Sequence, residues 1–97
     1  MRAYLTTTAA KAQSILTVGY DDPDQFDGRA GNWLGDRPLS VFDGFAGDVT
    51  LRLDIADDVF RQYEVPDDDL GFRQALVPAD VLNGLTPPRV IDPDAEG

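Results

Sequence analysis

The 97-residue chain contains neither cysteine nor histidine. Without cysteine it can form no disulfide, no thiolate metal site and no thiol nucleophile. Without histidine it lacks the commonest general base and the commonest metal-ligating side chain. No apolar run approaches the roughly 18 residues of a membrane-spanning helix, and Met1–Tyr4 does not resemble the start of a signal peptide. We therefore expect a cytoplasmic protein that has no metal, no cofactor and no catalytic residues.

Positive charge is also scarce. Eight Lys and Arg oppose eighteen Asp and Glu, so the formal net charge is −10. Proteins that bind nucleic acids neutralise phosphates with Lys and Arg, so this chain has the wrong sign for direct binding to nucleic acid or to an anionic membrane. The charge predicts a basic protein surface as the partner, with an attraction that weakens as salt rises. Solubility alone is the other interpretation of such an acidic composition.

The length and the 42% share of hydrophobic residues are sufficient for one small domain with a core. One helix followed by several short strands predicts an α+β fold, with a mostly antiparallel sheet, one main N-terminal helix and short helical turns. We expect this domain to span residues 1–91 and to be followed by a flexible tail over 92–97.

An N-terminal helix is predicted over residues 9–18. Thr7 or Thr8 can accept a hydrogen bond from an unpaired N–H at its start, and Gly19 suits the left-handed residue that follows a helix. The spacing of its apolar residues predicts a buried face formed by Ala12, Ile15, Leu16 and Ala9.

The clearest strand is predicted over residues 48–55, where Val49, Leu51, Leu53 and Ile55 alternate with polar residues. Shorter strands are expected over 2–5, 32–35, 62–65, 70–77 and 89–91, with helical turns over 57–61 and 79–83. Tyr20–Gly31 lacks apolar periodicity and is interpreted as a loop. A further connection over 41–47 is expected to be anchored by Phe42 and Phe45.

Two clusters of acidic residues and one tryptophan are the candidate partner-binding residues: Asp21, Asp22, Asp24 and Asp27; Glu64, Asp67, Asp68 and Asp69; and Trp33. Neither cluster has the Gly and Glu spacing of an EF-hand calcium loop. The carboxylates are either solvated loop residues or groups that imitate the phosphates of a nucleic acid toward a basic partner. Trp33 lies between two glycines and is either an exposed interface anchor or part of the core.

The order of several short motifs gives the chain a family resemblance over residues 3–83. The motifs are Tyr4–Thr8, Ser14–Tyr20, Gly31–Leu39, Gly47–Leu53, Tyr63–Val65 and Phe72–Ala79. Together they resemble small bacterial domains with an ADP-ribosyltransferase-like fold, related to toxin transferases and RNA 2′-phosphotransferases.

This resemblance implies a fold that grips NAD with a His or Arg on the first strand, an aromatic or hydroxyl residue on a middle strand and a Glu on a late strand. The matching positions are Leu5, Trp33 or Leu34, and Gln74. Leu5 has no polar group, and Gln74 carries no charge to stabilise a developing cation. The resemblance therefore implies a scaffold that has lost catalysis.

The predicted function is that of a non-catalytic acidic protein, which binds a basic, nucleic-acid-binding surface of a partner and blocks it. In small size and acidity the chain is similar to phage-encoded anti-CRISPR proteins, which implies a subunit of a CRISPR effector complex as the partner. The alternative is a minimal NAD-dependent ADP-ribosyltransferase or toxin-like enzyme that uses Tyr4, Thr6, Arg37 and Gln74.

Overall fold

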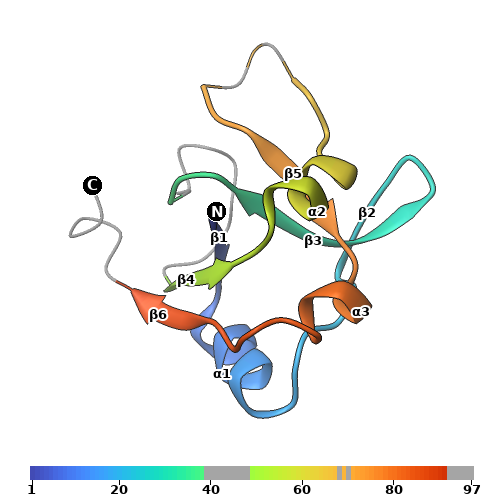
Figure 1. Ribbon diagram of the computed structural model, residues 1–97. Helices are drawn as coiled ribbons and strands as arrows, with labels where there is room; N and C mark the ends of the chain where they lie inside the picture. The colour runs from blue at the N-terminus through green and yellow to red at the C-terminus, as the bar shows by residue number, and fades with distance from the viewer. Residues whose placement is uncertain (39–48, 68, 70, 92–97) are drawn as a thin grey trace.

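Six short strands form an antiparallel sheet in the computed structural model, which describes residues 1–38, 49–67, 69 and 71–91 (Figure 1). The strands in this part of the chain are β1 (Arg2–Thr7), β2 (Asp24–Phe26), β3 (Arg29–Gly35), β4 (Val49–Asp54), β5 (Gln74–Val77) and β6 (Arg89–Ile91). The helices are α1 (Ala9–Thr17), α2 (Asp57–Gln62) and α3 (Ala79–Leu82). The predicted α+β fold with one longer N-terminal helix is confirmed.

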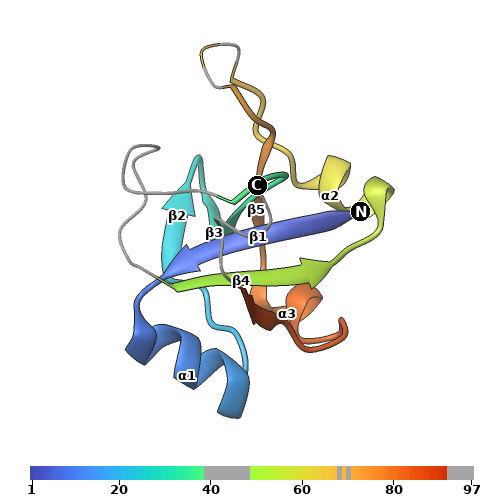
Figure 2. The same ribbon diagram turned by 90° about the vertical axis from the view of Figure 1, so that its left-hand side faces the viewer.

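The sheet has the order β2-β3-β1-β4-β6, and β5 also pairs with β3. β1 and β4 run side by side along their whole length, from Arg2 opposite Asp54 to Thr7 opposite Val49 (Figure 2). β3 pairs with β1 only where Gly35 lies opposite Tyr4. The rest of β3 pairs with β2 and β5, so this strand joins the two halves of the sheet.

One face of the sheet is buried by apolar side chains. Leu51, Leu53 and Ile55 are buried as their alternation predicts, although Thr50, expected on the wetter face, is also only 3% exposed. The other members of the buried core are Ala3, Leu5, Ala12, Ile15, Leu34, Phe60, Ala75, Val77 and Leu82. Each large aliphatic side chain buried in this way contributes about 1.5–3 kcal/mol to folding.

Helix α1 begins and ends at the predicted signals. The Thr8 hydroxyl oxygen accepts a hydrogen bond from the Lys11 N–H at 3.2 Å, and Gly19 adopts a positive φ of 118°. Ala12 is buried, but Leu16 is 45% exposed and Ala9 is exposed, so the predicted apolar face is too wide. The helix has only nine residues and packs against β4, so a narrow stripe of its surface is buried. The side chains of Ala9 and Leu16 lie outside that stripe.

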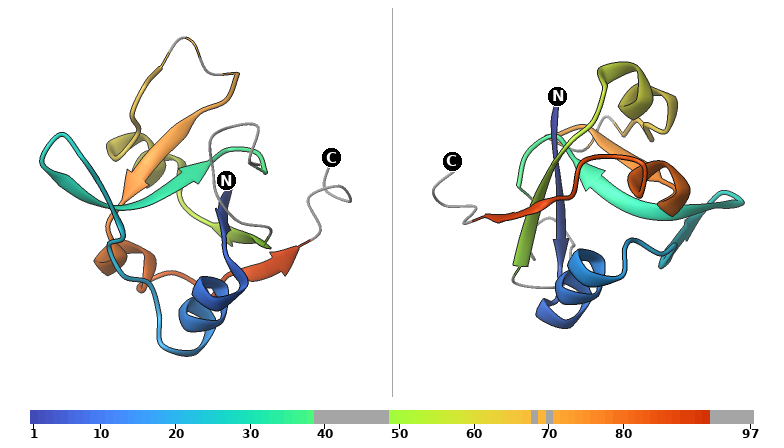
Figure 3. Two further views of the ribbon diagram at one scale, coloured as in Figure 1. Left: turned by 180° about the vertical axis from the view of Figure 1, so that it is seen from behind. Right: turned by 60° about the horizontal axis from the view of Figure 1, so that its bottom comes forward.

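The prediction of a loop over Tyr20–Gly31 is wrong in its second half. Residues 24–31 form a β-hairpin in which Asp27 and Gly28 are the two turn residues, with φ of 50° and 76°. Two positive φ values in a two-residue turn match the right-handed twist of a hairpin, and Asp-Gly is a favoured sequence for it. The hairpin extends from the rest of the sheet in Figure 1 and again in Figure 3.

Other boundaries differ less. The predicted strand over 70–77 begins only at Gln74, and in the segment predicted over 62–65 only Glu64 pairs, opposite Ala75. The helical turns over 57–61 and 79–83 and the edge strand over 89–91 are confirmed within a residue. The connection over 41–47 with Phe42 and Phe45, and the tail over 92–97, lie outside the described residues.

Gly31 provides a test of the close pairing between β3 and β5. A Cβ at Gly31 would lie 2.5 Å from the backbone oxygen of Val77. Gly31→Ala should therefore lower the free energy of unfolding by about 1–3 kcal/mol, the usual cost of overpacking, as measured by urea denaturation. Gly71→Ala is the matched control because its Cβ would meet open space. Equal unfolding midpoints for the two variants would contradict this packing.

Candidate interaction surface

The first acidic cluster divides into residues that hold the fold together and residues that face outward. Asp21 forms an ion pair with Lys11, and its backbone oxygen accepts a hydrogen bond from Asn32 Nδ2 at 2.7 Å. Asp22 Oδ1 accepts a hydrogen bond from the backbone N–H of Ala79 at 2.8 Å. Asn32 is only 1% exposed, so its hydrogen bond satisfies a buried amide. Asp21 and Asp22 therefore attach the segment before β2 to α1, β3 and α3.

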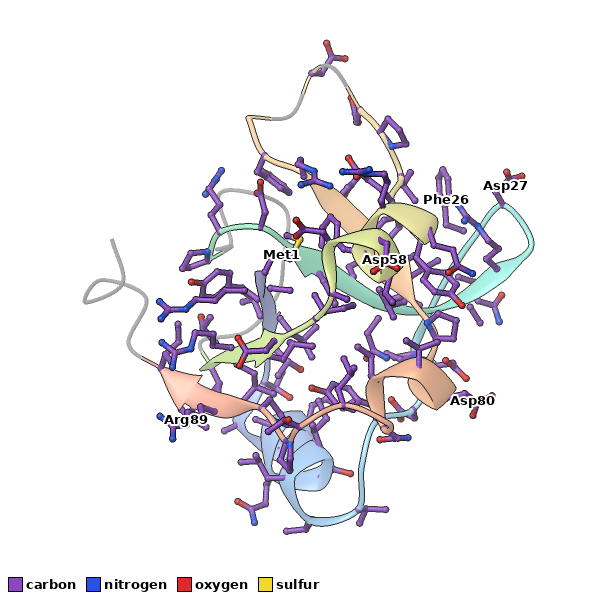
Figure 4. The ribbon with its side chains drawn as sticks, viewed as in Figure 1. Met1, Phe26, Asp27, Asp58, Asp80 and Arg89 are labelled. Atoms are coloured by element: carbon purple, nitrogen blue, oxygen red, sulfur yellow. The ribbon has the colours of Figure 1, made fainter. Side chains whose placement is uncertain are left out.

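Asp24 and Asp27 belong to the outward-facing group. Asp24 begins β2 and is partly exposed, and Asp27 occupies the exposed turn of the hairpin. Figure 4 shows the side chains of Phe26 and Asp27 at the outer end of the hairpin. No cation among the described residues pairs with either carboxylate.

The second cluster divides in the same way, because Glu64 is held by Arg73. Arg73 Nη2 donates to Glu64 Oε1 at 2.7 Å, and Arg73 Nε donates to Oε2 at 3.3 Å. The Arg73 guanidinium also lies 5.0 Å from the centre of the Phe60 ring. Its hydrogen bond lowers the pKa of the Glu64 carboxyl below the ordinary value of 4.5, and Glu64 raises the pKa of Arg73.

The backbone of Arg73 is fixed by a second carboxylate that the sequence analysis did not select. Its N–H donates to Asp36 Oδ1 at 3.1 Å, and the Asp36 N–H donates to the Arg73 backbone oxygen at 3.1 Å. Arg73, held in this way, offsets the negative charge of Glu64 within the chain. Less of that charge is therefore available to a partner. Asp36 and Arg73 are far apart in sequence, so no local pattern indicates this contact.

Asp67 and Asp69 lie in the connection between α2 and β5, which extends away from the sheet (Figures 1 and 2). Both are exposed, and Asp67 Oδ1 accepts a hydrogen bond from the Asp69 N–H at 3.0 Å. Asp68 lies outside the described residues. The two acidic clusters therefore occupy two separate projections of the molecule.

Trp33 is neither fully exposed nor fully buried, so it lies between the two interpretations made from the sequence. It lies on β3 opposite Leu76 of β5, and its ring meets the Phe26 ring edge to face, with 5.7 Å between the ring centres. Leu76 is 1% exposed, Trp33 is partly exposed, and Phe26 is 47% exposed. Trp33 therefore packs against Phe26 of the hairpin and remains partly exposed. The exposure of Phe26 is a feature that the sequence analysis missed.

The positions matched to the transferase family lie on both faces of the sheet. Leu5 is 7% exposed in the core, where no ligand reaches it. Tyr4 and Gln74 flank Gly35 in the strand register and so share the other face. The geometry brings together two residues of the alternative enzyme but not the residue that would hold its cofactor.

Comparisons of the chain with protein families, with curated proteins and with solved structures give no match. In the described part of the chain, no helix has the length and apolar character that crossing a membrane requires. Within the same residues, no three carboxylates gather closely enough to hold a metal ion together.

The pH dependence of stability tests the Glu64–Arg73 pair. A carboxyl whose pKa is lowered on folding stabilises the protein above its unfolded pKa, and that contribution disappears as pH falls through the folded pKa. Glu64→Gln should therefore destabilise the protein at pH 7 by about 0.5–1 kcal/mol, the range of partly exposed ion pairs. The difference from the parent should vanish as pH falls below 4.5.

A double-mutant cycle with Arg73→Gln isolates the pair from other effects of each substitution. Urea unfolding at pH 7 should give a favourable coupling energy between the two positions, and the same cycle at low pH should give none. Equal coupling at both pH values would contradict a charge-dependent contact.

Proposed function

We propose that this chain is a non-catalytic protein that binds a basic, nucleic-acid-binding surface of another protein and excludes nucleic acid from it. The observation that carries the proposal is the division of the acidic clusters. Asp24, Asp27, Asp67 and Asp69 project from two extensions of the sheet and pair with no described cation. They present negative charge to a partner at positions where no described cation neutralises it.

The net charge supports the same conclusion. Lys11 and Arg73 each neutralise one acidic residue of the two clusters, and the net charge of −10 is what remains after all eight Lys and Arg are counted. A surface of this sign attracts basic partners over about a Debye length and repels nucleic acid. Occupation of a basic groove by such a surface competes directly with the phosphates that the groove normally binds.

Within this class we propose a subunit of a CRISPR effector complex as the partner. Such complexes hold their guide and target strands in a positively charged channel, which an acidic protein of this size can enter. The small size and the acidity that this chain shares with phage-encoded anti-CRISPR proteins support the proposal. The cytoplasm, where these complexes act, is the compartment that follows from it.

Displacement of DNA from a basic probe tests the binding proposal. We expect the protein to release a fluorescently labelled single-stranded DNA from an oligo-arginine peptide, with an affinity that falls as salt rises. Asp67→Asn with Asp69→Asn should weaken this competition roughly fivefold at low salt, about 1 kcal/mol for two exposed charges. Asp24→Asn with Asp27→Asn should act similarly, because these carboxylates are also outward-facing.

Glu64→Gln is the matched control because it removes a carboxylate that Arg73 already neutralises. Its effect on the competition should be clearly smaller than the effect of either pair of surface substitutions. No release of DNA by the parent protein at low salt, or equal effects of all variants, would overturn the proposal.

The alternative, an NAD-dependent transferase, is favoured by one observation. The register brings Tyr4 and Gln74 to either side of Gly35, on the same face of the sheet. A thermal melt with and without millimolar NAD separates the two functions. A ligand at 100 times its dissociation constant adds about 2.7 kcal/mol of stability. We expect no shift in Tm, and a clear rise would favour the enzyme.

A further inference from the structure

The outer face of the β2–β3 hairpin carries an aromatic platform formed by Phe26 and Trp33. Phe26 lies directly opposite Arg29 in the strand register, and paired residues of antiparallel strands project to the same face. Trp33 shares this face because it lies four residues after Arg29 on β3. The intervening Asn32 and Leu34 project to the opposite face and are buried there.

The two rings come from the paired strands of one hairpin. Phe26 lies on β2, and Trp33 lies four residues beyond its register partner Arg29 on β3. The rings adopt an edge-to-face arrangement with an interplanar angle of 68°, which is a preferred geometry of aromatic pairs. The backbone of β3 and the buried Leu76 opposite Trp33 hold this platform in place.

The exposure of the platform is not explained by folding, because an aromatic side chain stabilises a fold by being buried. Phe26 is 47% exposed at the outer end of the hairpin, where Figure 4 shows it beside the turn residue Asp27. The hairpin residues 25–30 also line a surface hollow. An aromatic side chain that is partly exposed on a paired strand has the properties of an interface anchor.

Resting on the proposed function, we propose that this platform binds an arginine side chain of the basic partner. A guanidinium can stack on an aromatic face and pair with a carboxylate at its edge at the same time. Asp24 shares the face of Phe26 on β2, and Asp27 follows Phe26 at the turn. The platform therefore offers both elements that an arginine side chain needs.

The chain uses the same contact internally. The Arg37 guanidinium lies 4.7 Å from the centre of the Phe72 ring, and the Arg73 guanidinium lies 5.0 Å from the Phe60 ring. Arg29 lies opposite Phe26 in the strand register and is exposed. A second copy of this chain is a poor occupant, because two bodies of charge −10 repel one another.

Fluorescence provides the test, because Trp33 is the only tryptophan in the chain. Titration with an oligo-arginine peptide should change the Trp33 emission, whereas an oligo-lysine peptide of equal length should bind more weakly and change it less. Phe26→Ala should reduce the affinity for oligo-arginine about twofold to fivefold, the usual size of an exposed cation–π contact. The preference for arginine over lysine should fall with it.

Two control variants separate this contact from nonspecific effects. Phe26→Leu keeps the apolar volume but removes the aromatic ring, so it should lose the arginine preference while it remains folded. Val18→Ala changes a side chain that is 88% exposed at the C-cap of α1, outside the hairpin, and should leave the affinity unchanged. Thermal melts of each variant establish that the fold is retained.

The outcomes distinguish this inference from the proposed function. Salt-dependent peptide binding with unchanged Trp33 emission, or equal affinity of the parent and Phe26→Leu, would overturn the arginine platform and leave the acidic surface standing. Failure of the parent to bind either peptide at low salt would overturn the proposed function itself. A dimer in sedimentation that dissociates on Phe26→Ala would assign the platform to a second copy instead.

Discussion

The arrangement of the surface depends on β3, because this strand pairs with three others. Its first residues pair with β2, its last four pair with β5, and Gly35 alone pairs with β1. Because β3 pairs with three strands, its register is fixed. A shift by one residue would exchange its buried and exposed faces. Leu34 would then leave the core and Trp33 would enter it. This register therefore fixes the positions of three features. They are the β2–β3 hairpin, the aromatic platform of Phe26 and Trp33, and the start of β5, where the connection that carries Asp67 and Asp69 ends.

The acidic residues serve two purposes that composition cannot separate. Asp21, Asp22 and Glu64 form contacts that join segments distant in sequence, and Asp36 positions the backbone of Arg73. In these contacts a cationic side chain or a backbone N–H lies against the carboxylate. Part of its negative charge is therefore offset within the protein. The outward-facing carboxylates join no distant segments of the described structure, and the only hydrogen bond among them is the local one from the Asp69 N–H to Asp67 Oδ1, so we expect the fold to survive their removal. A function that depends on them is therefore separable from stability.

Local signals could be predicted from the sequence, and long-range contacts could not. The alternation over 48–55, the Thr8 cap and the left-handed Gly19 each depend on a few neighbouring residues. The cap and Gly19 agree with the structure, and the alternation agrees at Leu51, Leu53 and Ile55 but not at the buried Thr50. The hairpin also had a local signal in Asp27-Gly28, but its short flanks contain few alternating apolar residues. The Glu64–Arg73 pair depends on the pairing of Glu64 opposite Ala75 of β5, and the Phe26–Trp33 contact depends on the register of β2 against β3. The candidate acids were thus identifiable from sequence as a set, but not by their individual roles.

In the proposed complex, charge and aromatic contact contribute to different stages of binding. Uncompensated carboxylates on two projections raise the rate of encounter with a basic surface, because electrostatic attraction acts before contact and orients the approach. This attraction does not distinguish arginine from lysine or one basic groove from another. An aromatic platform acts only at contact, and it prolongs the complex when a guanidinium of the partner lies in place. An acidic protein that lacked such an anchor would exchange rapidly among all basic surfaces, so selective blocking of one groove requires a short-range contact of this kind.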